Sequence, residues 1–145
     1  MPRATCTPLS ATAGEDGGMV LALLLDVVLV VAFAAAGRAS HDSDVLAGLW
    51  QTSWPFLVAL LVGWLVVRGW RAPAAPVRTG LGLAAVTVAG GMLLRAASGQ
   101  GTALPFVVVA TLTLFAVLVG WRVVARAIGA LRARRSLSRG AGSRA

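Results

Sequence analysis

The sequence predicts an all-α integral membrane protein, a polytopic bundle of four transmembrane helices. Of its 145 residues, 58% are hydrophobic and only 12% are charged, and the mean hydropathy is +0.84. A soluble domain with so few polar residues would expose large apolar patches to water. Four apolar runs along the chain indicate that a lipid bilayer resolves this conflict.

The first predicted span covers about 19–37 and follows a segment, 1–18, that we expect to be a disordered cytoplasmic tail. Asp26 is the only charged residue of its apolar run and costs about +2.5 to +3.5 kcal/mol on the membrane-insertion scale. The leucines, valines and Phe33 of the run contribute about −0.3 to −0.6 kcal/mol each, so insertion stays favourable. A cleaved signal peptide is the alternative, but the residues before the run include two acids rather than a basic stretch.

The other predicted spans cover about 50–68, 76–95 and 105–128. The apolar runs inside the first two of these are short for a hydrocarbon core about 30 Å thick, which requires about 20 residues. We therefore expect flanking residues to lengthen both helices. The transmembrane domain then covers 19–131, and the basic segment 132–145 is expected to be a disordered cytoplasmic tail.

The distribution of arginine predicts the orientation. All thirteen basic residues are arginines, a composition typical of bacteria with GC-rich genomes. If the N-terminus is cytoplasmic, eleven arginines lie on the cytoplasmic side and only Arg38 and Arg95 on the other. The positive-inside rule therefore favours a multi-pass protein of the cell (plasma) membrane with both termini in the cytoplasm, and with Trp70 and Trp121 in the inner aromatic belt.

The placement of the arginines also predicts the partners. They lie at the ends of apolar runs and near the C-terminus, which argues against nucleic acid despite the net charge of +8. We expect the lipid bilayer to be the main partner, with anionic lipids contacting the C-terminal arginines. The third run contains small residues, among them Ala85 and Ala89, that either pack within the chain or form a homo-oligomer.

Two stretches of the chain are similar to each other, and one interpretation is that the bundle is built from two similar helical hairpins. Each has an arginine, then a Thr-x-x-Pro-Phe motif, then Leu-Val-Gly-Trp; the copies begin at Arg38 and Arg95 and end at Trp64 and Trp121. The gap from proline to tryptophan is seven residues longer in the second copy. Seven residues make about two helical turns, so the tryptophans keep nearly the same face. Short apolar motifs also recur by chance, which is the alternative to a duplication.

Five short motifs occur in order along the chain: Gly37-Arg38 with His41, Thr52 with Pro55-Phe56, Gly63-Trp64, Gly91-Met92 with Arg95, and Gln100-Gly101-Thr102. They resemble the motifs of a prokaryotic integral membrane family, the domain of unknown function 3054, over roughly 25–125. The resemblance implies a four-helix integral membrane protein. It implies no activity and no catalytic residue.

A polar cluster is expected at the outer surface, on loops and helix ends. Its members are Arg38, His41, Asp42, Asp44, Thr52, Arg95, Gln100 and Thr102. Two arginines in one mouth repel each other unless acids or a bound anion neutralise them, and guanidinium groups suit carboxylate or phosphate. Alternatively, the arginines cap their helices and reach lipid phosphates, with the aspartates as partners. One histidine with two loop carboxylates is a weak metal signal, so we expect no metal.

An acidic residue inside a spanning helix indicates either a function or a buried pair. Asp26 lies seven residues into its run, about 10 Å deep at about 1.5 Å per residue, and Arg122 lies at a similar depth in the last run. We therefore predict a structural Asp26–Arg122 ion pair within the membrane. A proton- or cation-coupling role for Asp26 is the alternative.

The sequence contains no nucleophile–base pair, phosphate-binding glycine loop or zinc-ligand spacing, so we expect neither an enzyme nor a cofactor. The leading hypothesis is a small carrier or channel-like protein whose outer mouth attracts an anionic solute through Arg38 and Arg95. The rival is a structural or accessory membrane protein with no ligand of its own. A carrier requires the arginines to line a water-facing concavity, whereas an accessory protein can turn them towards lipid or partner acids.

Overall fold

The computed structural model describes residues 12–39 and 45–142, with side chains described for 17–37 and 48–135. Within this part of the chain the structure is helical and has no strand: α1 (Thr12–Ala39), α2 (Val45–Val66), η1 (Gly69–Arg71), η2 (Pro76–Leu81), α3 (Gly82–Ala97) and α4 (Leu104–Gly142). The short elements are a 3-10 turn, η1, and a π-helical turn, η2, that leads directly into α3.

Four helical segments are long and apolar enough to cross a membrane: Gly17–Gly37, Gly48–Val66, Pro76–Ala97 and Leu104–Arg135. The predicted all-α fold with four membrane-spanning helices is confirmed, and the chain is a multi-pass membrane protein. The third span reaches sufficient length because the π-helical turn η2 extends α3 at its N-terminal end. The apolar run of α3 alone is too short for a core about 30 Å thick.

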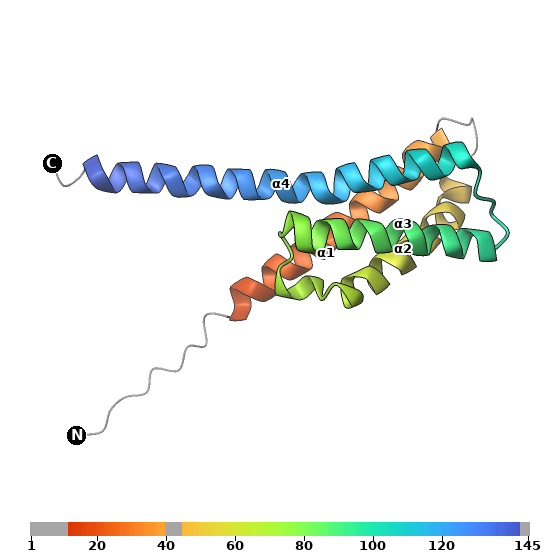
Figure 1. The fold of residues 1–145 in the computed structure, drawn as a ribbon, viewed down its shortest axis with the longest axis horizontal. Helices are drawn as coiled ribbons and strands as arrows, with labels where there is room; N and C mark the ends of the chain where they lie inside the picture. The colour runs from red at the N-terminus through yellow and green to blue at the C-terminus, as the bar shows by residue number, and fades with distance from the viewer. Residues whose placement is uncertain (1–11, 40–44, 143–145) are drawn as a thin grey trace, which may run out of the picture.

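The four helices form one bundle in which each helix packs against the next and α4 returns to α1. Figure 1 shows the end of α1, the start of α2 and the α3–α4 connection at one end of the bundle. The α2–α3 connection lies at the opposite end, where α1 begins and towards which α4 extends. We call these the Arg95 end and the termini end. Helices joined by short connections run antiparallel, so residues near the start of α1 and the end of α2 lie at the termini end.

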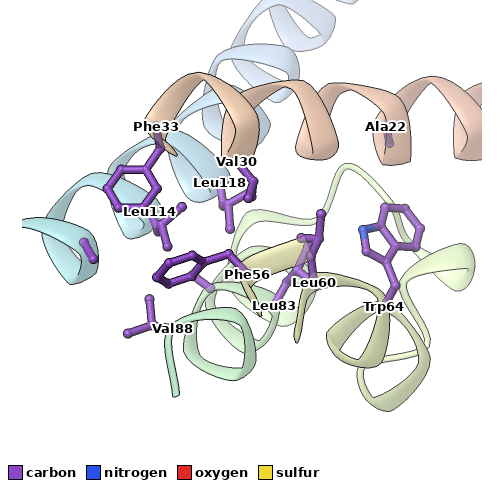
Figure 2. Packing of buried hydrophobic residues seen from close by; sticks show 12 residues of the cluster. Ala22, Val30, Phe33, Phe56, Leu60, Trp64, Leu83, Val88, Leu114 and Leu118 are labelled. Atoms are coloured by element: carbon purple, nitrogen blue, oxygen red, sulfur yellow. The ribbon is translucent and has the colours of Figure 1, made fainter. Parts of the chain in front are cut away.

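The bundle core is formed by aliphatic side chains together with three phenylalanines. Phe33, Phe56 and Phe106 come from α1, α2 and α4, and their ring centroids lie 5.6–6.3 Å apart. Figure 2 shows Phe33 close to Phe56, while Trp64 lies at the opposite end of the core. Such ring pairs contribute about 0.5–1.5 kcal/mol beyond the area they bury. Phe56 and Phe106 also occupy equivalent places in the two similar stretches of sequence.

Small residues let α2 and α3 approach closely. A Cβ added to Gly91 would overlap the Phe56 ring, and one added to Gly90 would lie 3.0 Å from the Ala59 Cβ. These glycines therefore serve packing within the chain, as expected for helix contacts in lipid. In contrast, Ala85 and Ala89 are exposed on the outside of the bundle.

Both terminal segments differ from the expectation of disordered tails over 1–18 and 132–145. α1 already begins at Thr12, and α4 continues to Gly142. Thr12 and Glu15 have the spacing of a helix-start signal, and the C-terminal segment is rich in alanine, leucine and arginine, which are strong helix formers. Intrinsic propensity therefore extends both helices beyond the bundle. At about 1.5 Å per residue, the 39 residues of α4 measure about 58 Å, nearly twice the hydrocarbon thickness.

Candidate functional site

The buried charges of the bundle meet between α1 and α4. Asp26 and Arg122 have 0% exposed side chains and form an ion pair. Arg122 Nη1 donates to Asp26 Oδ1 at 2.9 Å, and Nη2 donates to Oδ2 at 2.7 Å. The two residues matched by helical depth in the sequence are therefore in direct contact. This parallel two-bond geometry is the strongest that arginine forms with a carboxylate.

Two tryptophans donate the remaining hydrogen bonds to the Asp26 carboxylate. Trp64 Nε1 on α2 donates to Oδ2 at 3.0 Å, and Trp121 Nε1 on α4 donates to Oδ1 at 2.9 Å. Each carboxylate oxygen thus accepts one guanidinium and one indole hydrogen bond. The two tryptophans are the equivalent residues of the Leu-Val-Gly-Trp motifs, so the two similar stretches converge on one acid. We call Asp26, Trp64, Trp121 and Arg122 the Asp26 centre.

Arg122 also links the α2–α3 connection to α4 through a hydrogen bond. Its Nε donates to the Pro73 carbonyl at 2.9 Å, and its Nη1 donates to the Leu118 carbonyl at 2.7 Å. A Cβ added to Gly80 would lie 3.2 Å from Arg122 Cδ, so a glycine lets the connection approach this side chain. The guanidinium carbon lies 4.5 Å from the centroid of the Trp121 ring, a cation–π distance.

All acceptor positions of the Asp26 carboxylate are occupied by hydrogen bonds. A carboxylate offers about four acceptor positions, and Asp26 accepts four hydrogen bonds. Uncompensated charge in a low-dielectric interior is expensive, whereas this pair is neutral overall and hydrogen-bonded. A coupling carboxylate would need an open position for a proton or a cation. The geometry therefore favours the structural role of Asp26 over the coupling role.

The second polar site lies at the Arg95 end. Arg95 Nη1 donates to Gln100 Oε1 at 3.0 Å, and Nη2 donates to the Gln100 carbonyl at 3.3 Å. Gln100 lies in a tight turn between Gly99 and Gly101, whose φ angles of +71° and +76° suit glycine. The Arg95 guanidinium carbon also lies 4.4 Å from the centroid of the Phe106 ring on α4. Arg95 therefore bridges the end of α3, the connection and the start of α4.

This site contains two buried donors that have no acceptor: Arg95 Nε and Gln100 Nε2. The nitrogen and oxygen of one amide are close together, so Gln100 Nε2 also lies beside the guanidinium. Buried polar groups are paired in most folded proteins, and an orphaned group often marks the place of a water or an ion. Thr87 Oγ1 is the third buried side-chain atom without a partner, but its residue lies in the apolar core. Among the residues that the structure describes, only those at the Arg95 end combine orphaned donors with a positive charge.

Other members of the predicted outer cluster are not gathered around Arg95 by the described contacts. Thr52 Oγ1 donates to the Gly48 carbonyl of its own helix at 3.2 Å, and Thr102 is exposed. The Arg38 side chain and the residues His41, Asp42 and Asp44 lie outside the described part of the chain. Among the described residues, no group of three histidine, cysteine or acidic side chains could hold a metal ion.

The sequence analysis missed the tryptophan ligands of Asp26. Trp121 was expected in the inner aromatic belt, and Trp64 had no assigned role. Their indole nitrogens instead point inwards to the carboxylate, because the N–H of a buried tryptophan requires an acceptor. The available signal was the repeated Gly-Trp pair, which occurs once in each similar stretch.

Comparison with known proteins gives one assignment. The family described as "Protein of unknown function (DUF3054)" matches residues 23–125, a range that contains the Asp26 centre and Arg95 with Gln100. No curated protein and no solved structure matches the chain. The predicted resemblance is confirmed, and since the match covers most of the sequence, the chain belongs to this family of proteins of unknown function.

Proposed function

We propose that the chain is a small carrier or channel-like membrane protein that receives an oxyanion at Arg95. The observation that carries this proposal is the pair of orphaned donors, Arg95 Nε and Gln100 Nε2, beside one guanidinium. A carboxylate or phosphate oxygen satisfies both donors and supplies the missing charge. In this assignment the protein performs no enzymatic reaction.

The charge at Arg95 supports an anion rather than a neutral ligand. Asp26 is the only acidic residue with a described side chain. It forms its ion pair with Arg122, away from Arg95. Arg95 therefore has only neutral oxygens of Gln100 as described acceptors. Hydrogen bonds between two charged groups are roughly twice as strong as neutral ones, so an oxyanion is the better acceptor. The two Gln100 oxygens stay on the guanidinium, and Arg95 Nε and Gln100 Nε2 receive the anion.

The rival function is a structural or accessory membrane protein, and the Asp26 centre favours it. That centre uses its charges for packing and leaves no acceptor position open. If Arg95 is likewise satisfied by Gln100 and Phe106, the bundle needs no ligand. The two functions differ in whether a soluble anion binds at Arg95.

Thermal unfolding of the purified protein in detergent, against a panel of carboxylates, phosphate and sulfate, tests the proposal. An anion at about 100 times its dissociation constant should stabilise the native protein by about 2.7 kcal/mol. Arg95→Gln should lose this effect. Arg132→Gln removes an exposed arginine from α4 and is the matched control, which should retain it. If no anion stabilises the native protein, the accessory function replaces this one.

Transport requires a second measurement, because binding alone does not move a solute. Uptake of the stabilising anion into proteoliposomes should depend on Arg95. A four-helix unit is small to enclose a pathway, so the proposal includes a homo-oligomer, with the exposed Ala85 and Ala89 face as its seam. Binding without uptake would reduce the proposal to an anion-binding accessory protein.

We place the Arg95 end outside the cell and the termini end in the cytoplasm. The arginines of the α2–α3 connection and those at the end of α4 support this orientation through the positive-inside rule. A C-terminal fluorescent protein that folds only in the cytoplasm should be bright, and a C-terminal alkaline phosphatase should be inactive. The opposite result would reverse the orientation and place Arg95 on the cytoplasmic side.

A further inference from the structure

Four exposed arginines surround the termini end of the bundle, and we call them the basic rim: Arg68, Arg71, Arg78 and Arg126. The first three belong to the α2–α3 connection, and the fourth is on α4, about one turn beyond Arg122. The hydrogen bond from Arg122 to the Pro73 carbonyl holds the connection against α4. The rim therefore belongs to one packed surface rather than to separate loops.

The rim alternates cations with exposed apolar side chains. Val66 and Val77 are exposed and lie next to or near Arg68 and Arg78 in the sequence. Exposed apolar residues also occur in the nearby parts of η2 and α4: Leu81, Val123, Val124 and Ile128. Val77 is 71% exposed although it lies beside a charged residue. A partner that fits this surface must combine a negative group and hydrocarbon chains in one molecule. Nucleic acid and acidic protein segments satisfy the charge but not the apolar surface.

Arg68 occupies a position that normally favours glycine. It follows the last residues of α2 with φ +51° and ψ +53°, in the left-handed region, and it is the only described non-glycine residue with a positive φ. Helices often end with a glycine in this conformation because any other side chain is strained there. The neighbouring Gly69 packs against the Trp64 ring, where a Cβ would lie 2.5 Å from Trp64 Cε3. The arginine at this turn is exposed, so its charge lies on the surface of the α2–α3 connection.

The rim has no described acid to neutralise it. The carboxylate of Asp26 is buried and bonded to Arg122, so it is closed to the exposed arginines. Clustered arginines near a membrane surface attract anionic lipids, and guanidinium groups bind phosphate oxygens in two-bond geometry. We propose that the basic rim is a site for the phosphate groups of anionic phospholipids, whose acyl chains cover the adjacent valines and leucine. This inference is independent of the function proposed for Arg95.

Native mass spectrometry of the full chain in detergent, with phosphatidylglycerol and phosphatidylcholine as probes, tests the site. The native protein should retain phosphatidylglycerol at least tenfold more strongly than phosphatidylcholine. Arg71→Gln with Arg78→Gln should reduce phosphatidylglycerol binding at least fivefold. Arg132→Gln with Arg134→Gln is the matched control. It removes the same charge from exposed positions further along α4, where attraction of anionic lipid is diffuse, and should change binding less than twofold. Equal losses in both variants would show diffuse attraction and overturn the site.

Two further arms identify the occupant. Glycerol phosphate, which has the headgroup without acyl chains, should compete at least a hundredfold more weakly than the lipid. A short RNA should not displace the lipid at matched phosphate concentration. Displacement by either one would overturn the lipid assignment. Arg95→Gln should leave lipid binding unchanged, so the failure of one proposal does not affect the test of the other.

Discussion

Arg122 and Arg95 are two arginines of spanning helices that stack at nearly the same distance over an aromatic ring, 4.5 Å and 4.4 Å, yet they differ in what they bond. Arg122 is fully buried and pairs with a carboxylate. Arg95 is half-buried and bonds the neutral oxygens of Gln100.

The difference lies in how many elements supply partners. Around Arg122, the acceptors come from α1, the α2–α3 connection and α4, and α2 adds Trp64 to the same acid. Around Arg95, both acceptors come from one residue in the turn that follows its own helix. In the centre assembled from many elements each guanidinium nitrogen has an acceptor, whereas a single-residue partner leaves Arg95 Nε unpaired. An arginine in a membrane span is therefore structural when the bundle supplies an acceptor to each of its nitrogens, and available for a ligand when it does not.

The largest effect should come from Asp26→Asn, which makes the Asp26 centre resemble the Arg95 end by removing its ionised acceptor. Arg122 would remain buried without a counter-charge, and breaking a buried pair in this way costs about 3–5 kcal/mol. The free energy of unfolding in detergent should fall by this amount. Asp26→Asn combined with Arg122→Gln should recover much of the loss, because the pair is removed as a unit. Additive losses in the double mutant would contradict the coupling of the two residues.

A smaller effect is expected for the two tryptophans. Trp64→Phe and Trp121→Phe each keep an aromatic ring but remove one hydrogen bond to the carboxylate, which costs about 1.5–3 kcal/mol for a charged acceptor. Trp64 should be the more costly of the two because its side chain is more deeply buried. Unfolding curves of both variants, with exposed Trp70→Phe as the control, measure the difference. A larger loss of stability for Trp121→Phe would indicate that the stacking of Trp121 with Arg122 matters more than the depth of burial.

The smallest change in stability, and the sharpest comparison, is expected for Gln100→Glu. This nearly isosteric substitution gives Arg95 a resident carboxylate and so makes the Arg95 end resemble the Asp26 centre. A partly exposed pair of this kind contributes about 0.2–1 kcal/mol. The protein should become slightly more stable, and stabilisation by added anions should disappear. If anions still stabilise the variant, they bind elsewhere, and the proposed site at Arg95 is wrong.

The fold was largely predictable from local sequence, and the site only in part. Hydropathy located all four spans. The constant rise per residue of a helix converts sequence position into depth in the membrane, and equal depth matched Asp26 with Arg122. Depth does not specify direction around a helix axis, so the inward-facing indoles were missed. At the other end, adjacency in sequence brings Gln100 to Arg95, but no pattern in the sequence shows that two donors remain unpaired.

Sequence by itself determined that the chain crosses the membrane four times, since that outcome depends on the summed transfer of each apolar run into lipid. It also determined the family, which depends on local motifs. Only the tertiary structure decided that three helices and the α2–α3 connection meet at the Asp26 centre, and that Gly91 admits the Phe56 ring. The physical reason is that rotation and approach of helices in lipid are set by side-chain packing between segments distant in sequence.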